Sequence, residues 1–116
     1  MTRLILASQS PARLAVLRGA GIEPEVVVSG VDEDGMVADS CADLALALAR
    51  LKAEAVAAGI DDVAGPTIVV GCDSVLELDG QPLGKPHDPI IARERWLQQR
   101  GRDAVLHSGH WVIRLD

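Results

Sequence analysis

Aromatic side chains are nearly absent from this sequence, and it carries no excess of basic residues. Two tryptophans, with no phenylalanine or tyrosine, make aromatics 2% of the 116 residues, whereas hydrophobic residues make up 48%. The core must therefore be built from Val, Leu, Ile and Ala. The formal net charge of −6 argues against a surface that binds nucleic-acid polymers. A small anionic ligand is still compatible with this charge if a few cations converge locally.

Cysteines and long apolar runs are also scarce. Cys41 and Cys72 are not spaced as zinc ligands or as a disulfide framework. Cys72 lies in an apolar run, which predicts a small buried thiol. No apolar segment approaches the ~20 residues that a membrane-spanning helix needs. The N-terminus lacks the apolar region and cleavage site of a signal peptide. We therefore expect no membrane partner and a cytoplasmic location.

Length and periodicity predict one α/β domain over residues 1–116. Helices alternate with strands, which is typical of the α/β class. The expected helices cover residues 11–18, 42–58 and 89–99, and the expected strands cover residues 3–7, 25–29, 67–70, 75–78, 81–83 and part of 104–115. Since the sequence ends just after an apolar strand, we expect a sheet that is incomplete at the C-terminus.

The helix expected over residues 42–58 has clear start and periodicity signals. Ser40-x-x-Asp43 resembles a capping pair. Apolar residues at three- and four-residue spacing predict a core-facing stripe that consists of Leu44, Leu48, Leu51 and Ala55. Lys52 lies beside that stripe. Further along the chain, Asp79-Gly80 lies between two short apolar runs and predicts a two-residue hairpin.

The first segment that could carry chemistry follows the N-terminal strand. Ser8 or Ser10 can cap a helix, and Pro11 suits its first turn. The free N–H groups of that helix start and the forked cation of Arg13 together form a plausible anion cradle. The alternative is an ordinary capped helix with a solvated arginine.

Carboxylates form the second group of candidates. Asp73 follows a buried strand, at a position where open α/β sheets line their ligand crevice. There it could bind a divalent metal or orient a water for attack. Asp32-Glu33-Asp34 is a dense acidic loop that could supply oxygen ligands to a hard cation. The alternatives are an aspartate bonded to its own turn and a solvated acidic loop.

One of two notable lysines, Lys85, is a candidate phosphate ligand. Lys85 projects from a Gly-Pro turn, and a rigidly held lysine is a good point charge for phosphate. Lys52 flanks the apolar stripe of its helix. A surface lysine and a snorkelling lysine are the corresponding alternatives. His107 and His110 stand three residues apart in the last strand, on opposite faces, and are a poor metal pair.

The order of these motifs along nearly the whole chain resembles the Maf family. The resemblance rests on Ser8-x-Ser10-Pro11-x-Arg13, Val31-Asp32-Glu33, Leu51-Lys52-Ala53, Gly71-x-Asp73-Ser74-Val75, Asp79-Gly80 with Gly84-Lys85-Pro86, and Arg100-Gly101-Arg102 leading to His107-Ser108-Gly109.

The resemblance implies a fold, an activity and a set of roles. The fold would be that of the inosine triphosphatase-like pyrophosphatases, a mixed sheet flanked by helices. The activity would be hydrolysis of a nucleoside triphosphate, of the pyrimidine type such as dTTP or UTP, to the monophosphate and pyrophosphate. A divalent cation (Mg, Mn or Co) would take part. The implied roles are phosphate binding by Ser8, Arg13, Lys52 and Lys85, metal binding by Glu33, and water activation or metal binding by Asp73.

The sequence also departs from the family pattern. Ala12 stands where many members carry a second arginine, and residues 99–104 differ from the usual Leu-Ser-Gly-Arg-x-His motif. Family members run close to twice this length, so we expect a missing lobe and an exposed apolar edge that favours a homodimer. A nucleotide-binding module without catalysis and a non-functional fragment are the alternatives to an active enzyme.

Overall fold

The computed structural model describes residues 2–33, 35–61, 63–83 and 89–116, which form a mixed sheet flanked by helices. This confirms the α/β class. The elements along the chain are β1 (Arg3–Ala7), α1 (Pro11–Gly19), β2 (Glu25–Val26), α2 (Cys41–Ala58), β3 (Thr67–Leu78), β4 (Gln81–Leu83), α3 (Pro89–Gln99) and β5 (Val105–Leu115).

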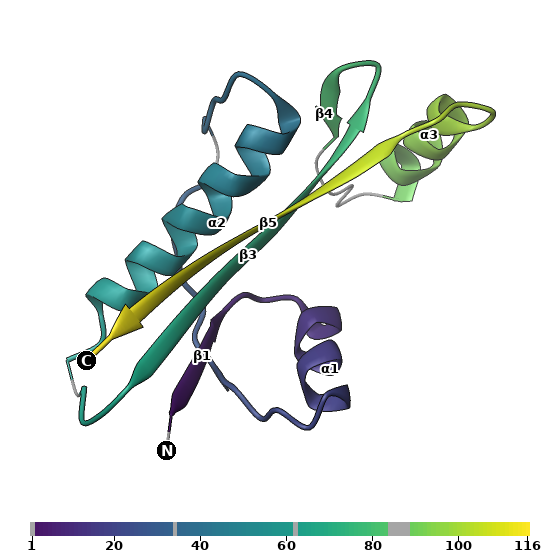
Figure 1. Cartoon of the computed structure of the whole chain (residues 1–116). Coiled ribbons are helices and arrows are strands. Elements are labelled where there is room, and N and C mark those ends of the chain that lie inside the picture. Colours follow the sequence, from purple (N-terminus) through teal and green to yellow (C-terminus); the bar gives the residue numbers. More distant parts are fainter. Residues whose placement is uncertain (1, 34, 62, 84–88) are drawn as a thin grey trace.

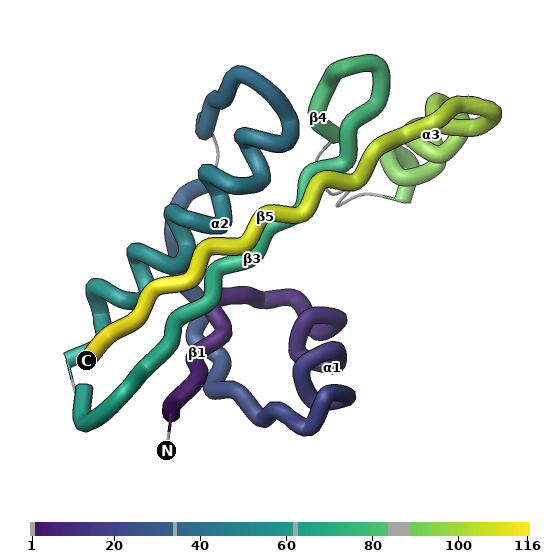
Figure 2. Tube along the Cα trace, viewed as in Figure 1, coloured from purple at the N-terminus to yellow at the C-terminus, as the bar shows by residue number. Residues whose placement is uncertain are grey.

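Strand β3 is the centre of the sheet (Figures 1 and 2). Its first half pairs in parallel with β1, from Arg3 opposite Thr67 to Ala7 opposite Gly71. Its last residues pair with β4, and β2 pairs with β1. On its other side β3 pairs with β5, antiparallel and over almost its full length. This long β3–β5 ribbon is the longest strand pair among the described residues, and β1 and β4 are added along the other edge of β3.

The break expected after Val70 is absent, since β3 continues through the Asp73 region to Leu78. The reason is non-local: β5 supplies a ladder partner for each residue from Gly71 to Ser74, which keeps this stretch extended within the sheet. The prediction that Asp73 sits at a strand break was therefore wrong. Strand β1 does end opposite Gly71, so Asp73 still lies just past the carboxyl end of a parallel neighbour. Strand β2 is shorter than the strand expected over residues 25–29.

Helix α2 lies unusually close to the sheet. A Cβ atom on Gly71 would come within 2.8 Å of the Ala53 Cβ, and one on Gly109 would lie 2.5 Å from the Ala45 carbonyl oxygen. Only glycine in the strands and small residues on the helix permit this approach. Two glycines of β3 and β5 therefore set the depth at which α2 packs.

This close packing overturns the predicted core stripe of α2. Of the four residues expected to face the core, only Leu48 is buried. The gap between helix and sheet has room for alanine but not for a continuous row of leucines. The buried face is instead formed by Cys41, Ala45, Leu48, Ala49, Ala53 and Val56. Lys52, expected beside the core stripe, lies on this packed side of the helix.

The helix caps and the hairpin turn, which depend on residues close together in the sequence, agree with the predictions. Ser10 caps α1, its Oγ accepting a 3.4 Å hydrogen bond from the Arg13 amide. Ser40 caps α2 by accepting one of 3.0 Å from the Asp43 amide. Asp79 and Gly80 have φ of 54° and 76°, as a two-residue type I′ hairpin requires. The predicted hairpin and the predicted cap of α2 are confirmed.

The described chain is elongated, with extents of 51 × 30 × 22 Å. Its radius of gyration is 16.0 Å, whereas a compact domain of about 100 residues has roughly 13 Å. Helix α3 lies at one end of the ribbon and has no buried residue (Figure 1). Among the described residues, no helix is long and apolar enough to cross a membrane.

Candidate functional site

Three elements bring one ammonium and two carboxylates together. Lys52 of α2 places its Nζ 2.8 Å from Glu33 Oε1 and 2.9 Å from Asp73 Oδ2. Glu33 comes from the loop that precedes α2, and Asp73 from the middle of β3. The side chains of Lys52 and Asp73 are each 14% exposed, and that of Glu33 is 42% exposed. The cluster is therefore half-closed, with Glu33 on its open side.

The surroundings of Lys52 keep its ammonium charged. Burial alone lowers the pKa of this group, but its contacts with Glu33 and Asp73 outweigh burial, so the pKa is raised above its ordinary value. A raised pKa means that Lys52 is a full positive charge at neutral pH. Two carboxylates thus share one buried cation.

Asp73 uses its two oxygens differently. Its Oδ1 accepts a 2.8 Å hydrogen bond from the Ser74 amide, which orients the carboxylate. Its Oδ2 is buried and accepts no well-aligned hydrogen bond from the described residues. The ion pair with Lys52 is the contact that the structure gives this oxygen. A buried carboxylate oxygen with spare acceptor capacity is suited to a cation or a water.

A second group of side chains surrounds the Arg13 guanidinium. Its Nη2 donates a 2.8 Å hydrogen bond to Ser74 Oγ, and its Nη1 donates one of 3.4 Å to Ser8 Oγ. Ser74 Oγ lies 3.0 Å from Ser108 Oγ on β5. Ser8 is buried and also accepts a 3.1 Å hydrogen bond from the Ser10 amide. The guanidinium is therefore held by hydroxyls and has no carboxylate among these hydrogen-bond partners.

The two groups meet at adjacent residues of β3. Asp73 and Ser74 are neighbours, so their side chains point to opposite faces of the sheet. Asp73 faces α2 and Lys52, whereas Ser74 faces α1 and Arg13. The structure thus joins Glu33, Lys52 and Asp73 in one cluster and Ser8 and Arg13 in another. Lys85 lies outside the described residues.

Sequence reasoning missed Ser74 and Ser108 as members of the site. Both stand in quoted motifs, but neither was assigned a role. Their contact joins β3 to β5 across 34 residues, and it follows from the register that pairs Ser74 with Ser108. The available signal was the alternation of side chains along each strand, which cannot by itself give that register.

Another quoted motif lies away from these clusters. Arg102 pairs with Asp79 at the hairpin that ends β3, with Nη1 2.6 Å from Oδ2. The guanidinium of Arg100 lies over the Trp96 ring, with its central carbon 5.7 Å from the ring centroid. In this structure the Arg100-Gly101-Arg102 segment therefore packs at the far end of the ribbon.

The thiol predicted to be buried is buried, and it adjoins both clusters. Burial raises the pKa of Cys72, while the nearby Arg13 and Lys52 charges act in the opposite direction. The net shift is upward, so Cys72 is a neutral thiol at physiological pH. The prediction of a small buried thiol is confirmed.

The cluster on the α2 side fits a hard divalent cation in part. Glu33 and Asp73 offer oxygen ligands, and Asp73 Oδ2 has acceptor capacity to spare. Within the described ranges no group of three or more His, Cys, Asp or Glu side chains is placed to hold a metal. Magnesium is commonly bound by one or two carboxylates, with water and substrate phosphate completing its shell. The residues present are consistent with that mode.

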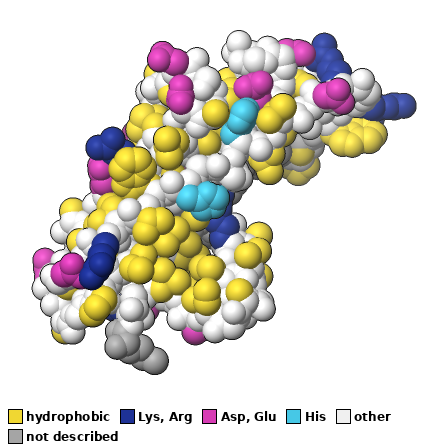
Figure 3. All heavy atoms as spheres, viewed as in Figure 1, with side chains coloured by type: hydrophobic (Ala, Val, Ile, Leu, Met, Phe, Trp, Pro, Cys, Tyr) yellow, Lys and Arg dark blue, Asp and Glu magenta, His cyan; other side chains and the backbone are white. Residues whose placement is uncertain are grey.

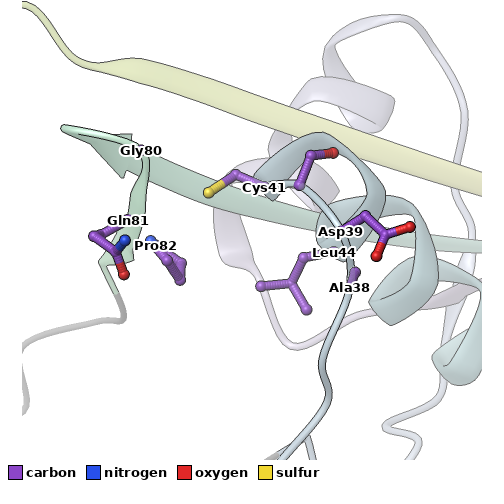
Figure 4. Close-up of a pocket in the computed structure, with 8 residues that line it drawn as sticks. Ala38, Asp39, Cys41, Leu44, Gly80, Gln81 and Pro82 are labelled. Carbon is purple, nitrogen blue, oxygen red and sulfur yellow. The ribbon is translucent and has the colours of Figure 1, made fainter.

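A separate hollow of about 210 Å³ opens between the start of α2 and the β3–β4 hairpin (Figure 4). None of the predicted site residues lines it. Its lining combines the α2 cap with the hairpin: Ala38, Asp39, Ser40, Cys41, Leu44, Gly80, Gln81 and Pro82.

Several curated proteins that are similar to this chain share one name. A protein from Streptomyces coelicolor named "Nucleoside triphosphate pyrophosphatase" is 59% identical over 110 residues, covering 95% of this chain and 52% of that protein. Proteins of the same name from Salinispora tropica and Nocardia farcinica are 54% and 56% identical, covering 96% and 97% of this chain and 50% and 55% of their own length. The chain spans about half the length of these relatives.

A crystal structure titled as a nucleoside-triphosphatase / dITP/XTP pyrophosphatase from Mycobacterium abscessus is a distant structural match. It is 16% identical with a TM-score of 0.35, covering 97% of this chain and 71% of that one. A likeness this weak bears on neither fold nor function. The family model described as "Maf-like protein", by contrast, matches residues 3–116. With relatives above 50% identity along that span, this match shows that the chain belongs to the Maf family.

Proposed function

We propose that this chain binds nucleoside triphosphates and hydrolyses them to the monophosphate and pyrophosphate. The observation that carries the proposal is the Lys52–Glu33–Asp73 cluster, separated by one strand from the Ser8–Arg13 cluster. The names of the relatives, which are nucleoside triphosphate pyrophosphatases, support it. We assign the substrate to the pyrimidine class, such as dTTP or UTP, and the site of action to the cytoplasm.

The phosphate groups are the part of the substrate that these cations suit. The Arg13 fork and the Lys52 ammonium neutralise charge on the phosphates, and Lys85 is proposed as a third cation. Ser8 Oγ adds a hydroxyl donor beside Arg13. Positive groups around a shielded phosphorus lower the barrier to attack by stabilising charge in the transition state.

Asp73 is proposed to act on the attacking water. Its carboxylate orients the water and accepts the proton as the water oxygen bonds to the α-phosphorus, while the Ser74 amide fixes the orientation of the carboxylate. The bond from the α-phosphorus to the bridging oxygen breaks, and pyrophosphate leaves. Glu33 and Asp73 would hold the divalent cation, which when bound neutralises phosphate charge and polarises the water.

The test is direct product analysis. The purified chain is incubated with Mg²⁺ and, separately, UTP, dTTP and 7-methyl-GTP, and products are separated by anion-exchange chromatography. We expect monophosphate and pyrophosphate, most rapidly from UTP or dTTP. Asp73→Asn should reduce turnover at least about a hundredfold, whereas Asp61→Asn, in an exposed loop, should not.

Unchanged triphosphate in all three reactions would overturn the enzymatic proposal. Stabilisation of the chain by nucleotide in a thermal melt would then identify a binding module. Absence of both turnover and stabilisation would identify a chain without either function.

A further inference from the structure

We propose that Lys52 is a built-in counter-ion for the metal site: its ammonium occupies the space between Glu33 and Asp73, and a divalent cation binds there only by displacing it. The inference rests on the proposed function, because it takes these carboxylates as the metal-binding pair. It adds that the metal and the Lys52 ammonium are mutually exclusive in this position.

The distances make the two cations competitors for the same oxygens. Lys52 Nζ lies 2.8 Å from Glu33 Oε1 and 2.9 Å from Asp73 Oδ2. Magnesium held by those oxygens would lie at about 2.1 Å from each, well inside the space of the ammonium. Two positive charges so close would also repel strongly in a partly buried site. One of them must leave.

Burial explains why a cation is needed there before any ligand arrives. Asp73 is largely buried and faces the core side of β3, where an uncompensated carboxylate is costly. Lys52 offsets that cost from within the chain. Lys52 reduces the charge of the cluster from −2 to −1 without metal, so metal that must displace it gains less by entering.

The packing of α2 limits what can move. Gly71 of β3 lets the backbone of Ala49 and Ala53 approach closely, so the helix around Lys52 is fixed against the sheet. The displaced group must therefore be the side chain, whose four-carbon stem is flexible. When the ammonium leaves the two carboxylates, the oxygens of the triphosphate become its new anionic partners.

This arrangement couples metal to nucleotide. Phosphate draws Lys52 away from Glu33 and Asp73 and at the same time completes the metal shell that two carboxylates leave open. Metal and nucleotide should each strengthen the binding of the other, by the same factor. In the absence of nucleotide, metal affinity should be low.

The test measures Mn²⁺ binding alone, without nucleotide, by isothermal titration and by electron paramagnetic resonance of free Mn²⁺. Lys52→Met removes the charge and keeps a long apolar stem, and we expect it to bind Mn²⁺ on the order of tenfold more tightly than the wild type. Lys52→Arg, which keeps the charge, should stay weak. Arg50→Met, on the same helix and exposed, should match the wild type.

Two further variants secure the interpretation. Adding Glu33→Gln to Lys52→Met should abolish the gain, because it removes one of the two carboxylates. If Lys52→Met does not fold without metal, Lys52→Gln replaces it, since its amide can donate to the carboxylates without a charge. Mn²⁺ binding no tighter than wild type in both Lys52 variants would overturn the proposal.

The outcome separates this inference from the proposed function. Tighter Mn²⁺ binding by the uncharged variants, with no triphosphate turnover by the wild type, supports the counter-ion and rejects the enzyme. Turnover by the wild type with unchanged Mn²⁺ binding in the variants rejects the counter-ion and leaves the enzyme in place.

Discussion

At the scale of the residue, the forked geometry of Arg13 matters as much as its charge. One guanidinium donates to Ser8 through Nη1 and to Ser74 through Nη2, which joins the start of α1 to the middle of β3. Both partners are neutral hydroxyls, so the positive charge is oriented without being neutralised by them. A lysine would supply the charge as a single point and could not keep both contacts.

Arg13→Lys should therefore raise the KM for UTP by roughly tenfold, because the fork that positions the cation is lost. Arg18→Lys is the matched control on the same helix. Arg18 is exposed and pairs with Glu23, and exposed ion pairs contribute little. Steady-state kinetics of both variants gives the comparison, and equal KM values would remove Arg13 from phosphate binding.

The two cysteines predict how stability responds to alkaline pH. Burial raises the pKa of Cys41 and of Cys72 above the ordinary value of 9.0. The folded state therefore favours the protonated thiols, and their contribution to stability is intact below pH 9. It is lost as the pH rises from that value through the raised folded pKa.

Urea unfolding between pH 7.5 and 10.5 tests this direction. The free energy of unfolding of the wild type should fall at the alkaline end of the range. The Cys41→Ala, Cys72→Ala double variant should show a flatter profile, because neither thiol is left to ionise. Parallel profiles for the two proteins would show that other groups account for the alkaline loss.

At the scale of the element, the position of α2 depends on two strand residues that have no side chain. Gly71 and Gly109 leave hollows on β3 and β5 into which the backbone of α2 settles. Lys52 reaches Asp73 because of that depth. A helix seated farther from the sheet would hold the same residues but would leave the two charges apart.

Gly71→Ala should destabilise the chain by about 1–3 kcal/mol, since the new methyl group would overlap Ala49 and Ala53 and force the helix outward. Gly59→Ala is the matched control at the end of α2, where a Cβ atom would meet its nearest neighbour at an ordinary 3.6 Å. Urea melts of the two variants measure the difference. Equal stability would mean that α2 accommodates the methyl group without cost.

At the scale of the whole molecule, the long β5 strand leaves apolar surface on the outside. In the described part of the chain, no strand pairs with the edge of β5 that faces away from β3. Leu106 and Val112 on this strand are exposed, and hydrophobic side chains gather on the face of the sheet between β5 and α1 (Figure 3). Long exposed edges and apolar patches favour association with another chain.

We therefore expect the purified chain to form homodimers at micromolar concentration, detected as concentration-dependent sedimentation. Val112→Lys should weaken this association, because it places a charge on the apolar face of β5. Val37→Lys, at an exposed loop position that is not part of β5, serves as the control. A wild-type chain that sediments as a monomer at all concentrations would contradict the expectation.

Residues close in sequence determined much of this protein in advance. The caps at Ser10 and Ser40, the Asp79-Gly80 hairpin and the span of α2 follow from short-range preferences of the backbone. The ordered motifs also predicted the family, now shown by the match over residues 3–116. The same motifs named Ser8, Arg13, Glu33, Lys52 and Asp73 for the candidate site, but they did not name Ser74 or Ser108.

Tertiary structure alone decided how these pieces meet. The pairing of β3 with β5 turned an expected break at Asp73 into continuous strand and brought Ser108 to Ser74. The depth of α2 on two glycines replaced the predicted leucine stripe with alanines and placed Lys52 between Glu33 and Asp73. Such features depend on strand register and on the space between elements, which are set by contacts across tens of residues and leave no local signal.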